Sequence, residues 1–121
     1  MKYLYLGEDA DGVSHFEERE IAFDLADFAP PAPPMGMSAT TDARRLLYLD
    51  LPPGWKDGRH RAPRRQIGFC LSGRMRVTAS DGDVRMVEPG GIWQMEDVAG
   101  EGHASEVVGD QPVVLAIVQL D

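Results

Sequence analysis

The sequence predicts an all-β fold, a sandwich or a small barrel, from three observations. Short runs rich in Val, Ile, Leu, Met and Phe are separated by turns containing Gly and Pro, at a spacing of roughly ten residues. No segment has the length and periodicity of a long helix. With 121 residues, the chain is near the usual size of one domain. We therefore expect about eight strands around one core, in a single domain spanning residues 1–121.

The first 44 residues differ in composition from the rest and predict an N-terminal arm ahead of a barrel core at residues 45–121. Residues 2–6, KYLYL, form a short apolar run, and residues 20–28, EIAFDLADF, fit an edge strand and a helical turn equally well. Residues 29–36, APPAPPMG, hold four prolines. Because proline has a fixed φ and no backbone N–H, this segment predicts an extended, polyproline-like connection over the surface.

Within the core, two segments predict strands with definite faces. In residues 74–87, apolar and polar side chains alternate around Asp81-Gly82, a pair that is typical of a tight hairpin turn. The residues expected on the packed face are Met75, Val77, Ala79, Val84 and Met86. In residues 113–120, VVLAIVQL, apolar residues occur at odd-numbered and even-numbered positions alike. This pattern predicts a central strand covered on both faces.

Charge and cysteine content argue against several classes of function. The formal net charge of -8 repels phosphate backbones and anionic lipids, so we expect neither nucleic-acid nor membrane partners. No apolar run approaches the roughly 20 residues that a bilayer span needs, and the N-terminus turns acidic too early for a signal peptide. The simplest localisation is therefore cytoplasmic. The single cysteine, Cys70, is expected to be a small buried apolar residue.

Residues 45–120 carry two spaced motifs. The first motif begins at one glycine and ends at another, with three positions between them of which the first two flank a single residue. These five positions are occupied by Gly54, His60, Ala62, Gln66 and Gly73. The second is filled by Gly90, Gly100 and His103. These spacings resemble the two motifs of the cupins, and the wider pattern is similar to a group of small single-domain bacterial cupins. The resemblance implies a double-stranded β-helix, or jelly-roll barrel, with an N-terminal arm.

The resemblance also implies a metal site with altered ligands. Cupins use three His and one Glu to hold a divalent transition metal, and the matching positions here are His60, Ala62, Gln66 and His103. Two imidazoles and one neutral amide remain, without the carboxylate that strengthens divalent sites. Glu96 or Asp97, in the loop before His103, would restore a carboxylate if the loop folds inward. The expected cofactor is iron, manganese, nickel or zinc, or no metal at all.

Strand parity places the candidate residues around a cavity. Residues two apart share a face of a strand, so His60 and Gln66 are expected to point into the barrel beside the small Gly68. His103 arrives from another strand of the barrel. Gln66 suits a hydrogen bond to a ligand as well as a metal, and Trp93 is either rim packing or a substrate contact.

A cluster of four arginines at residues 59–65 stands out in this acidic chain. A solvated face is the usual explanation of such a run. In the alternative, Arg64 or Arg65 leans into the barrel mouth and binds a substrate carboxylate or phosphate through its guanidinium.

Two functions from different classes follow. The first is a cupin-type enzyme acting on a small anionic metabolite, either with a metal held by His60, Gln66 and His103 or with His60 or His103 as general acid or base. The second is a non-catalytic ligand-binding or sensor module that has lost its metal site. In both cases the arm and an exposed sheet edge predict a homodimer, because pairing would cover the edge.

Overall fold

The computed structural model describes residues 1–121 and consists of strands, turns and loops, which confirms the all-β prediction. Its strands are β1 (Lys2–Glu8), β2 (Ser14–Glu20), β3 (Asp24–Ala26), β4 (Met35–Met37), β5 (Arg45–Leu51), β6 (Gln66–Ser72), β7 (Arg74–Ala79), β8 (Val84–Val87), β9 (Ile92–Met95), β10 (His103–Val108) and β11 (Val113–Gln119). They form sheets of six, three and two strands. None of its elements is a helix with the length and hydropathy needed to cross a membrane.

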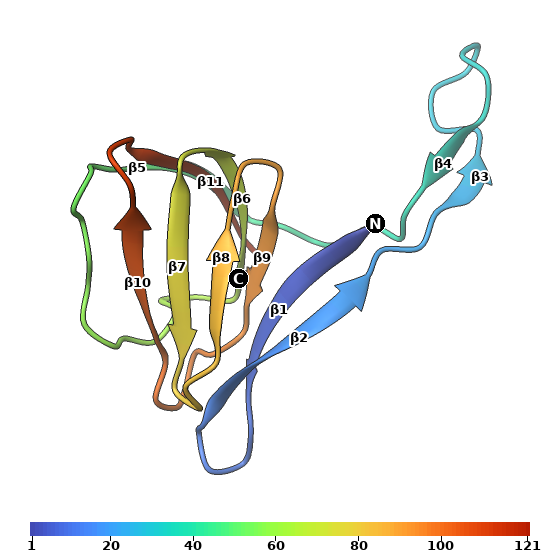
Figure 1. Ribbon diagram of the computed structural model, residues 1–121. Coiled ribbons are helices and arrows are strands. Elements are labelled where there is room, and N and C mark those ends of the chain that lie inside the picture. Colours follow the sequence, from blue (N-terminus) through green and yellow to red (C-terminus); the bar gives the residue numbers. More distant parts are fainter.

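Two sheets face each other and enclose the core. The larger has the strand order β2-β1-β9-β6-β11-β5, and the smaller has the order β10-β7-β8. Figure 1 shows the smaller sheet in front of β5, β11, β6 and β9. From β6 to β11 the chain passes repeatedly from one sheet to the other. This winding is that of a jelly-roll barrel.

Side chains alternate between core and surface along the strands that enclose the core. In β7, β10 and β11, every second residue is buried, because successive side chains of a strand point to opposite faces. The buried apolar cluster comprises Leu6, Phe16, Ala62, Cys70, Met75, Val77, Ala79, Val87, Trp93, Met95, Val107, Val113, Leu115 and Ile117. Cys70 is a member of this cluster, as predicted.

The hairpin between β7 and β8 turns at Asp81-Gly82, as predicted. The predicted packed face holds for β7 but is wrong for β8, where Val84 and Met86 are exposed. Val77 pairs with Arg85, and directly paired residues share a face of the sheet. In β8 the residues that share a face with Arg85 therefore point toward the core. The alternation of inward and outward residues in β7 does not continue unchanged through the turn into β8.

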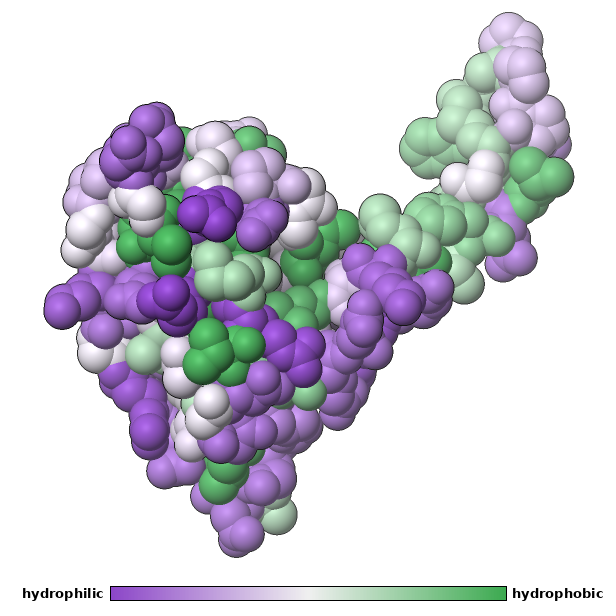
Figure 2. All heavy atoms as spheres, viewed as in Figure 1, coloured by the Kyte–Doolittle hydropathy of each residue, from purple (hydrophilic) through white to green (hydrophobic).

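Residues 1–20 belong to the barrel sheet, and only residues 21–44, which we call the arm, project from it. β1 pairs with β9 and with β2, which extends the larger sheet. The ambiguous segment 20–28 contains β3, which pairs with β4. The prolines of residues 29–36 lie in the connection that reverses the chain between these strands, far from the barrel (Figure 1), so the predicted extended connection over the surface is wrong. Figure 2 shows apolar residues gathered along this arm.

β11 lies between β6 and β5, which confirms its predicted central place in the sheet. Val113, Leu115 and Ile117 are buried on its inner face. The alternate residues, on the outer face, are only half-buried, because no further layer of the chain covers this side of the sheet. The prediction that both faces are covered is therefore wrong for the single chain.

Candidate functional site

A cavity of about 210 Å³ lies between the two sheets. Its lining comprises Leu49, Leu51, Trp55, Asp57, His60, Pro63, Gln66, Met75, Trp93, Met95, His103, Ser105, Leu115 and Ile117. Apolar side chains dominate this lining, and it contains no arginine or lysine. The volume is below the roughly 300 Å³ at which pockets for drug-sized ligands begin, so the cavity fits a small molecule.

His103 is the most deeply buried polar residue of the cavity. It is only 2% exposed, and its Nδ1–H donates to Oδ2 of Asp97 at 2.5 Å. Trp93 packs edge-on against the imidazole, with ring centroids 5.2 Å apart. The backbone N–H of Ala62 donates to the Asp97 carbonyl at 3.1 Å, which fixes the loop after β9. Nε2 of His103 makes no hydrogen bond within the protein and is left for a ligand.

His60 lies at the mouth of the cavity, with its side chain 47% exposed. Its ring centroid is 4.9 Å from that of His103. One ring nitrogen donates to Oδ2 of Asp57 at 2.5 Å and the other donates to the Arg61 carbonyl at 2.8 Å. Burial, the largest influence, lowers the pKa of His60, but these hydrogen bonds and the charges of Asp57 and Asp97 outweigh it and raise the pKa above its usual value. The surroundings of His60 therefore favour the imidazolium.

A close approach of two backbones brings the histidines together. The N–H of each residue donates to the carbonyl of the other at 2.9 Å, an isolated bridge between the loop before β6 and the start of β10. Gly102, just before His103, has a φ of 78°, a conformation that residues with a Cβ rarely adopt. A Cβ there would overlap the His60 carbonyl. Glycine at this position therefore permits the pairing of His60 with His103.

Asp57 and Ser105 are site residues that the sequence reasoning missed. Oδ1 of Asp57 accepts the backbone N–H of Ser105 at 2.8 Å, while its Oδ2 holds His60. Ser105 follows His103 by two residues on β10, so both point inward, and the Ser105 hydroxyl makes no hydrogen bond within the protein. Because residues two apart share a face of a strand, the position of His103 could have identified Ser105 as a second inward-facing residue. No local pattern singles out Asp57.

Gln66 and Trp93 line the cavity where the sequence placed them. The Gln66 amide is already engaged: its Nε2 contacts Met95 Sδ at 3.4 Å and its Oε1 accepts from Gln119 at 3.3 Å. Nε1 of Trp93 is buried without a hydrogen-bond partner. Both residues therefore shape the wall of the cavity, and their roles in binding a substrate stay predictions.

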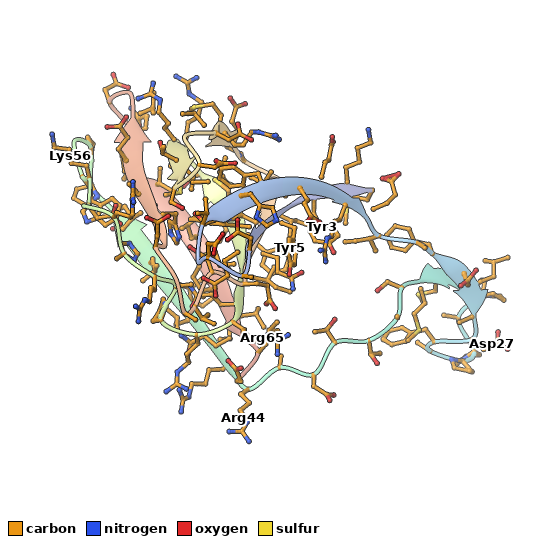
Figure 3. The ribbon with its side chains drawn as sticks, turned by 90° about the horizontal axis from the view of Figure 1, so that it is seen from below. Tyr3, Tyr5, Asp27, Arg44, Lys56 and Arg65 are labelled. Carbon is orange, nitrogen blue, oxygen red and sulfur yellow. The ribbon has the colours of Figure 1, made fainter.

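The structure places Arg64, Arg65 and Glu96 outside the cavity lining. Nε of Arg65 donates to Glu96 at 2.8 Å, and Arg65 also approaches Asp121 at 3.9 Å. Arg64 is exposed. Figure 3 shows Arg65 near Arg44, at one end of the larger sheet. Carboxylates therefore hold Arg65 at the surface. The structure gives no support to the alternative in which an arginine side chain reaches into the barrel mouth.

Comparison with known proteins agrees with this geometry. The family model of the cupin domain matches residues 47–119, more than half of the chain. The chain belongs to the cupin family. Among solved structures, this cupin is similar to the conserved protein of unknown function SPY1581 from Streptococcus pyogenes, at 23% identity and a TM-score of 0.51 over 69% of this chain and 70% of that one. No curated protein matches it.

The cupin domain of Cnp3 from Schizosaccharomyces pombe is a second similar structure. It has 15% identity to this cupin and a TM-score of 0.50, covering 88% of this chain and 74% of that one. At these identities the similarity supports the fold alone.

The donor groups of this cupin do not fit the metal site that the family pattern implies. Both nitrogens of His60 donate to oxygens, the Gln66 oxygen is engaged, and Ala62 supplies no donor atom. Glu96 faces Arg65 rather than the cavity. No group of three or more His, Cys, Asp or Glu side chains is placed to hold a metal ion. Metal binding therefore stays a prediction, and the geometry does not favour it.

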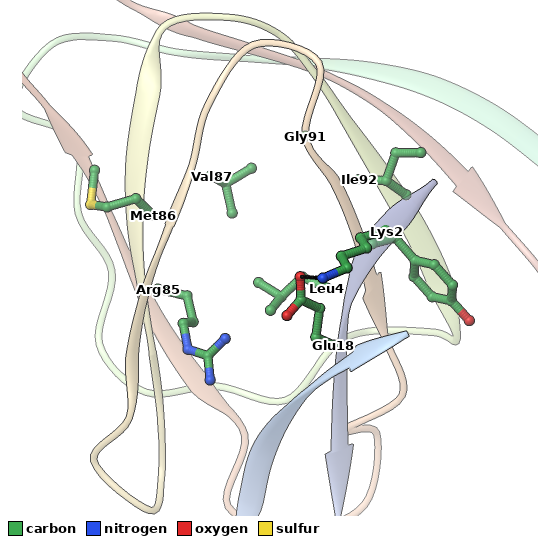
Figure 4. Close-up of a pocket in the computed structure, with 9 residues that line it drawn as sticks. Lys2, Leu4, Glu18, Arg85, Met86, Val87, Gly91 and Ile92 are labelled. Carbon is green, nitrogen blue, oxygen red and sulfur yellow. Dashed lines mark ion pairs between the residues drawn. The ribbon is translucent and has the colours of Figure 1, made fainter. Parts of the chain in front are cut away.

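A second hollow of the cupin, of about 290 Å³, opens between β1, β2, β8 and β9 (Figure 4). Lys2 and Glu18 form an ion pair at 3.7 Å across it, and Arg85 pairs with Asp83 at 3.0 Å. These charged side chains are well exposed and satisfy one another. The hollow has no buried, oriented group comparable with His103.

Proposed function

We propose that this cupin is a general acid–base enzyme for a small, uncharged and largely apolar carbonyl compound, with His103 as the base. One observation carries the proposal: the buried imidazole is held by Asp97 through Nδ1, which leaves Nε2 free toward the cavity. An imidazole that a carboxylate holds in this way is oriented for proton transfer at its other nitrogen. The proposal needs no metal.

The proposed reaction begins when Nε2 of His103 takes a proton from the carbon next to the substrate carbonyl. The electron pair of the broken C–H bond forms a C=C bond, and the carbonyl oxygen gains the negative charge of an enolate. The Ser105 hydroxyl donates a hydrogen bond to that oxygen, and Asp97 stabilises the imidazolium that forms. In a substrate with a C=C bond conjugated to the enolate, return of the proton from His103 to the far carbon of that bond completes an isomerisation. In a substrate with a leaving group on the neighbouring carbon, its C–X bond breaks, a C=C bond forms and His103 passes the proton to the departing group, which completes an elimination.

The cavity lining supports an uncharged substrate rather than the anionic metabolite expected from the sequence. No arginine or lysine lines it, and Asp57 neutralises the charge of His60 at the mouth. A substrate carboxylate would therefore lose its hydration without gaining a cationic partner, which is costly. A neutral carbonyl needs only one hydrogen-bond donor, which Ser105 offers.

Exchange of carbonyl-adjacent protons for deuterium tests the proposal. We expect the wild-type protein in D2O to accelerate the loss of these proton signals from cyclopentanone and 2-pentanone, followed by ¹H NMR. His103→Asn should slow the reaction by about 10²–10⁴-fold, the usual contribution of a general base. Ser105→Ala should slow it by roughly 10²-fold, as expected for a lost hydrogen bond to the developing oxyanion.

His15→Asn, a substitution on β2 outside the cavity, is the matched control and should leave the exchange rate unchanged. Treatment with EDTA should also have no effect. Equal rates for the wild type and His103→Asn would contradict the proposal. A rate that EDTA abolishes and a metal restores would replace it with the metalloenzyme, and ketone binding without exchange would replace it with the non-catalytic module.

A further inference from the structure

The loop that carries Asp97 belongs to no strand or helix. Residues 96–102, which we call the Asp97 loop, connect β9 to β10. The loop contains both the carboxylate that holds His103 and the glycine, Gly102, that lets His103 approach His60. A segment without regular secondary structure satisfies its backbone N–H and C=O groups through neighbouring elements. The position of Asp97 therefore depends on the elements that hydrogen-bond to this loop.

Glu8, the last residue of β1, holds the middle of the Asp97 loop. Its Oε1 accepts the backbone N–H of Ala99 at 3.0 Å, and its Oε2 accepts that of Gly100 at 2.6 Å. Hydrogen bonds to an ionised carboxylate are about twice as strong as those between neutral groups. The two oxygens of one side chain therefore fix two successive peptide groups, at the second and third residues after Asp97.

The turn between β1 and β2 holds the loop at two further points. The Gly12 carbonyl accepts the backbone N–H of Glu101 at 2.8 Å. The hydroxyl of Ser14, a residue that is 0% exposed, donates to the Gly102 carbonyl at 2.6 Å. Ser14 is fixed in turn by Ser80, because the backbone N–H of each donates to the hydroxyl oxygen of the other at 2.7 Å. These contacts extend to the residue that directly precedes β10.

Two glycines bring the turn and the loop into direct backbone contact. A Cβ at Gly100 would overlap the carbonyl oxygen of Gly12, and a Cβ at Gly12 would lie 3.0 Å from the Cα of Gly100. Figure 1 shows the β1–β2 turn at the same end of the barrel as the connection from β9 to β10. From the segment before β6, the backbone N–H of Ala62 donates to the Asp97 carbonyl at 3.1 Å. Two separate parts of the chain therefore hold the Asp97 loop.

We infer that Glu8 is a positioning residue for His103, because it fixes the loop that keeps the Asp97 carboxylate on Nδ1 of the imidazole. This role rests on the proposed function, in which the free Nε2 is the base. Glu8 does not line the cavity, so it acts through the loop and not through contact with a substrate. Without its carboxylate, the N–H groups of residues 99 and 100 bind water, and Asp97 is free to leave Nδ1. A neutral imidazole that loses this acceptor carries its proton on either nitrogen.

Glu8→Ala tests this role in the full-length protein. The variant should fold, because Ala99 is exposed and Gly100 is half-buried, so water reaches the freed N–H groups. Long-range ¹H–¹⁵N correlation spectra at slightly alkaline pH should show His103 as a mixture of its two tautomers. In the deuterium exchange of cyclopentanone, kcat should fall by about 10–10²-fold because the base is misplaced, while KM should change by less than about twofold.

Glu8→Gln separates the hydrogen bonds of this side chain from its packing. Glutamine has the same length, but its amide oxygen accepts one of the two N–H groups while its NH2 group faces the other without accepting it. The tautomer mixture and the kcat of this variant should therefore lie between those of the wild type and Glu8→Ala. The amide hydrogen exchange rates of residues 99 and 100 should rise in the same order.

Glu20→Ala is the matched control, since Glu20 is an exposed glutamate of β2 that makes no hydrogen bond to the Asp97 loop. Its spectra and exchange rate should equal those of the wild type. An unchanged His103 spectrum in both Glu8 variants would overturn the inference, even with a lower melting temperature, because Glu8 would then only stabilise the fold. A wild type that catalyses no exchange would contradict the proposed function, and the spectra would still decide the role of Glu8.

Discussion

Asp97→Ala is expected to lower the free energy of unfolding by about 1.5–3 kcal/mol, the usual worth of a hydrogen bond to a charged group. The wild-type carboxylate is fully buried and accepts the Nδ1–H of His103, which is itself 2% exposed. Without Asp97, that N–H loses its partner in a site that water hardly reaches. Thermal unfolding should shift downward by roughly 5–15 °C for a domain of this size.

A double-mutant cycle separates the Asp97–His103 interaction from other effects. His103→Ala combined with Asp97→Ala should cost less than the sum of the single substitutions, because the second change no longer leaves an unpaired group. Asp110→Ala removes an exposed aspartate with no ion pair and should change stability by less than about 0.5 kcal/mol. A loss below about 1 kcal/mol in Asp97→Ala would show that the pair does not hold the site together.

Gly102→Ala is expected to destabilise the protein by about 3 kcal/mol or more, since two costs add. Alanine at a φ of 78° is strained, and its Cβ would meet the His60 carbonyl. Relief of that overlap requires the loop that carries His60 to move away from β10. We therefore expect this variant to lose the backbone bridge between His60 and His103 together with stability, measured by chemical denaturation.

Gly109→Ala provides the matched comparison for Gly102→Ala. Gly109 also has a positive φ, of 89°, but a Cβ there would have no atom within 4 Å. Its replacement should cost only about 1–2 kcal/mol, the conformational penalty alone. Equal losses at the two positions would mean that the approach of Gly102 to His60 is not a tight contact.

The strands and their inner faces could be predicted because strand alternation is a local property. Met75 and Val77 are buried as their spacing predicted, and Asp81-Gly82 is the turn. The residues of β8 that face the core could not be predicted from those of β7, because they depend on which residues pair across the hairpin. The hairpin within the arm could not be predicted, because its prolines lie between two short strands whose pairing no local pattern shows.

Spacing within the two motifs located His60, Gln66 and His103 around one cavity. The carboxylates behind the histidines were harder to find. The sequence suggests Asp97 only as a metal ligand and does not point to Asp57, because both lie in loops whose direction no periodicity determines. The place of Arg65 was equally hard to predict, since its surface ion pairs depend on Glu96 and Asp121, which come from elsewhere in the chain.

We propose that Asp97 orients His103 so that its Nε2 is a free base in the cavity. Long-range ¹H–¹⁵N correlation spectra of the imidazoles, recorded at slightly alkaline pH, show which ring nitrogen carries the proton. We expect His103 to carry its proton on Nδ1 and none on Nε2, and we expect the Nε2 resonance to move when cyclopentanone is added. A proton on Nε2 with Nδ1 unprotonated would contradict the claim.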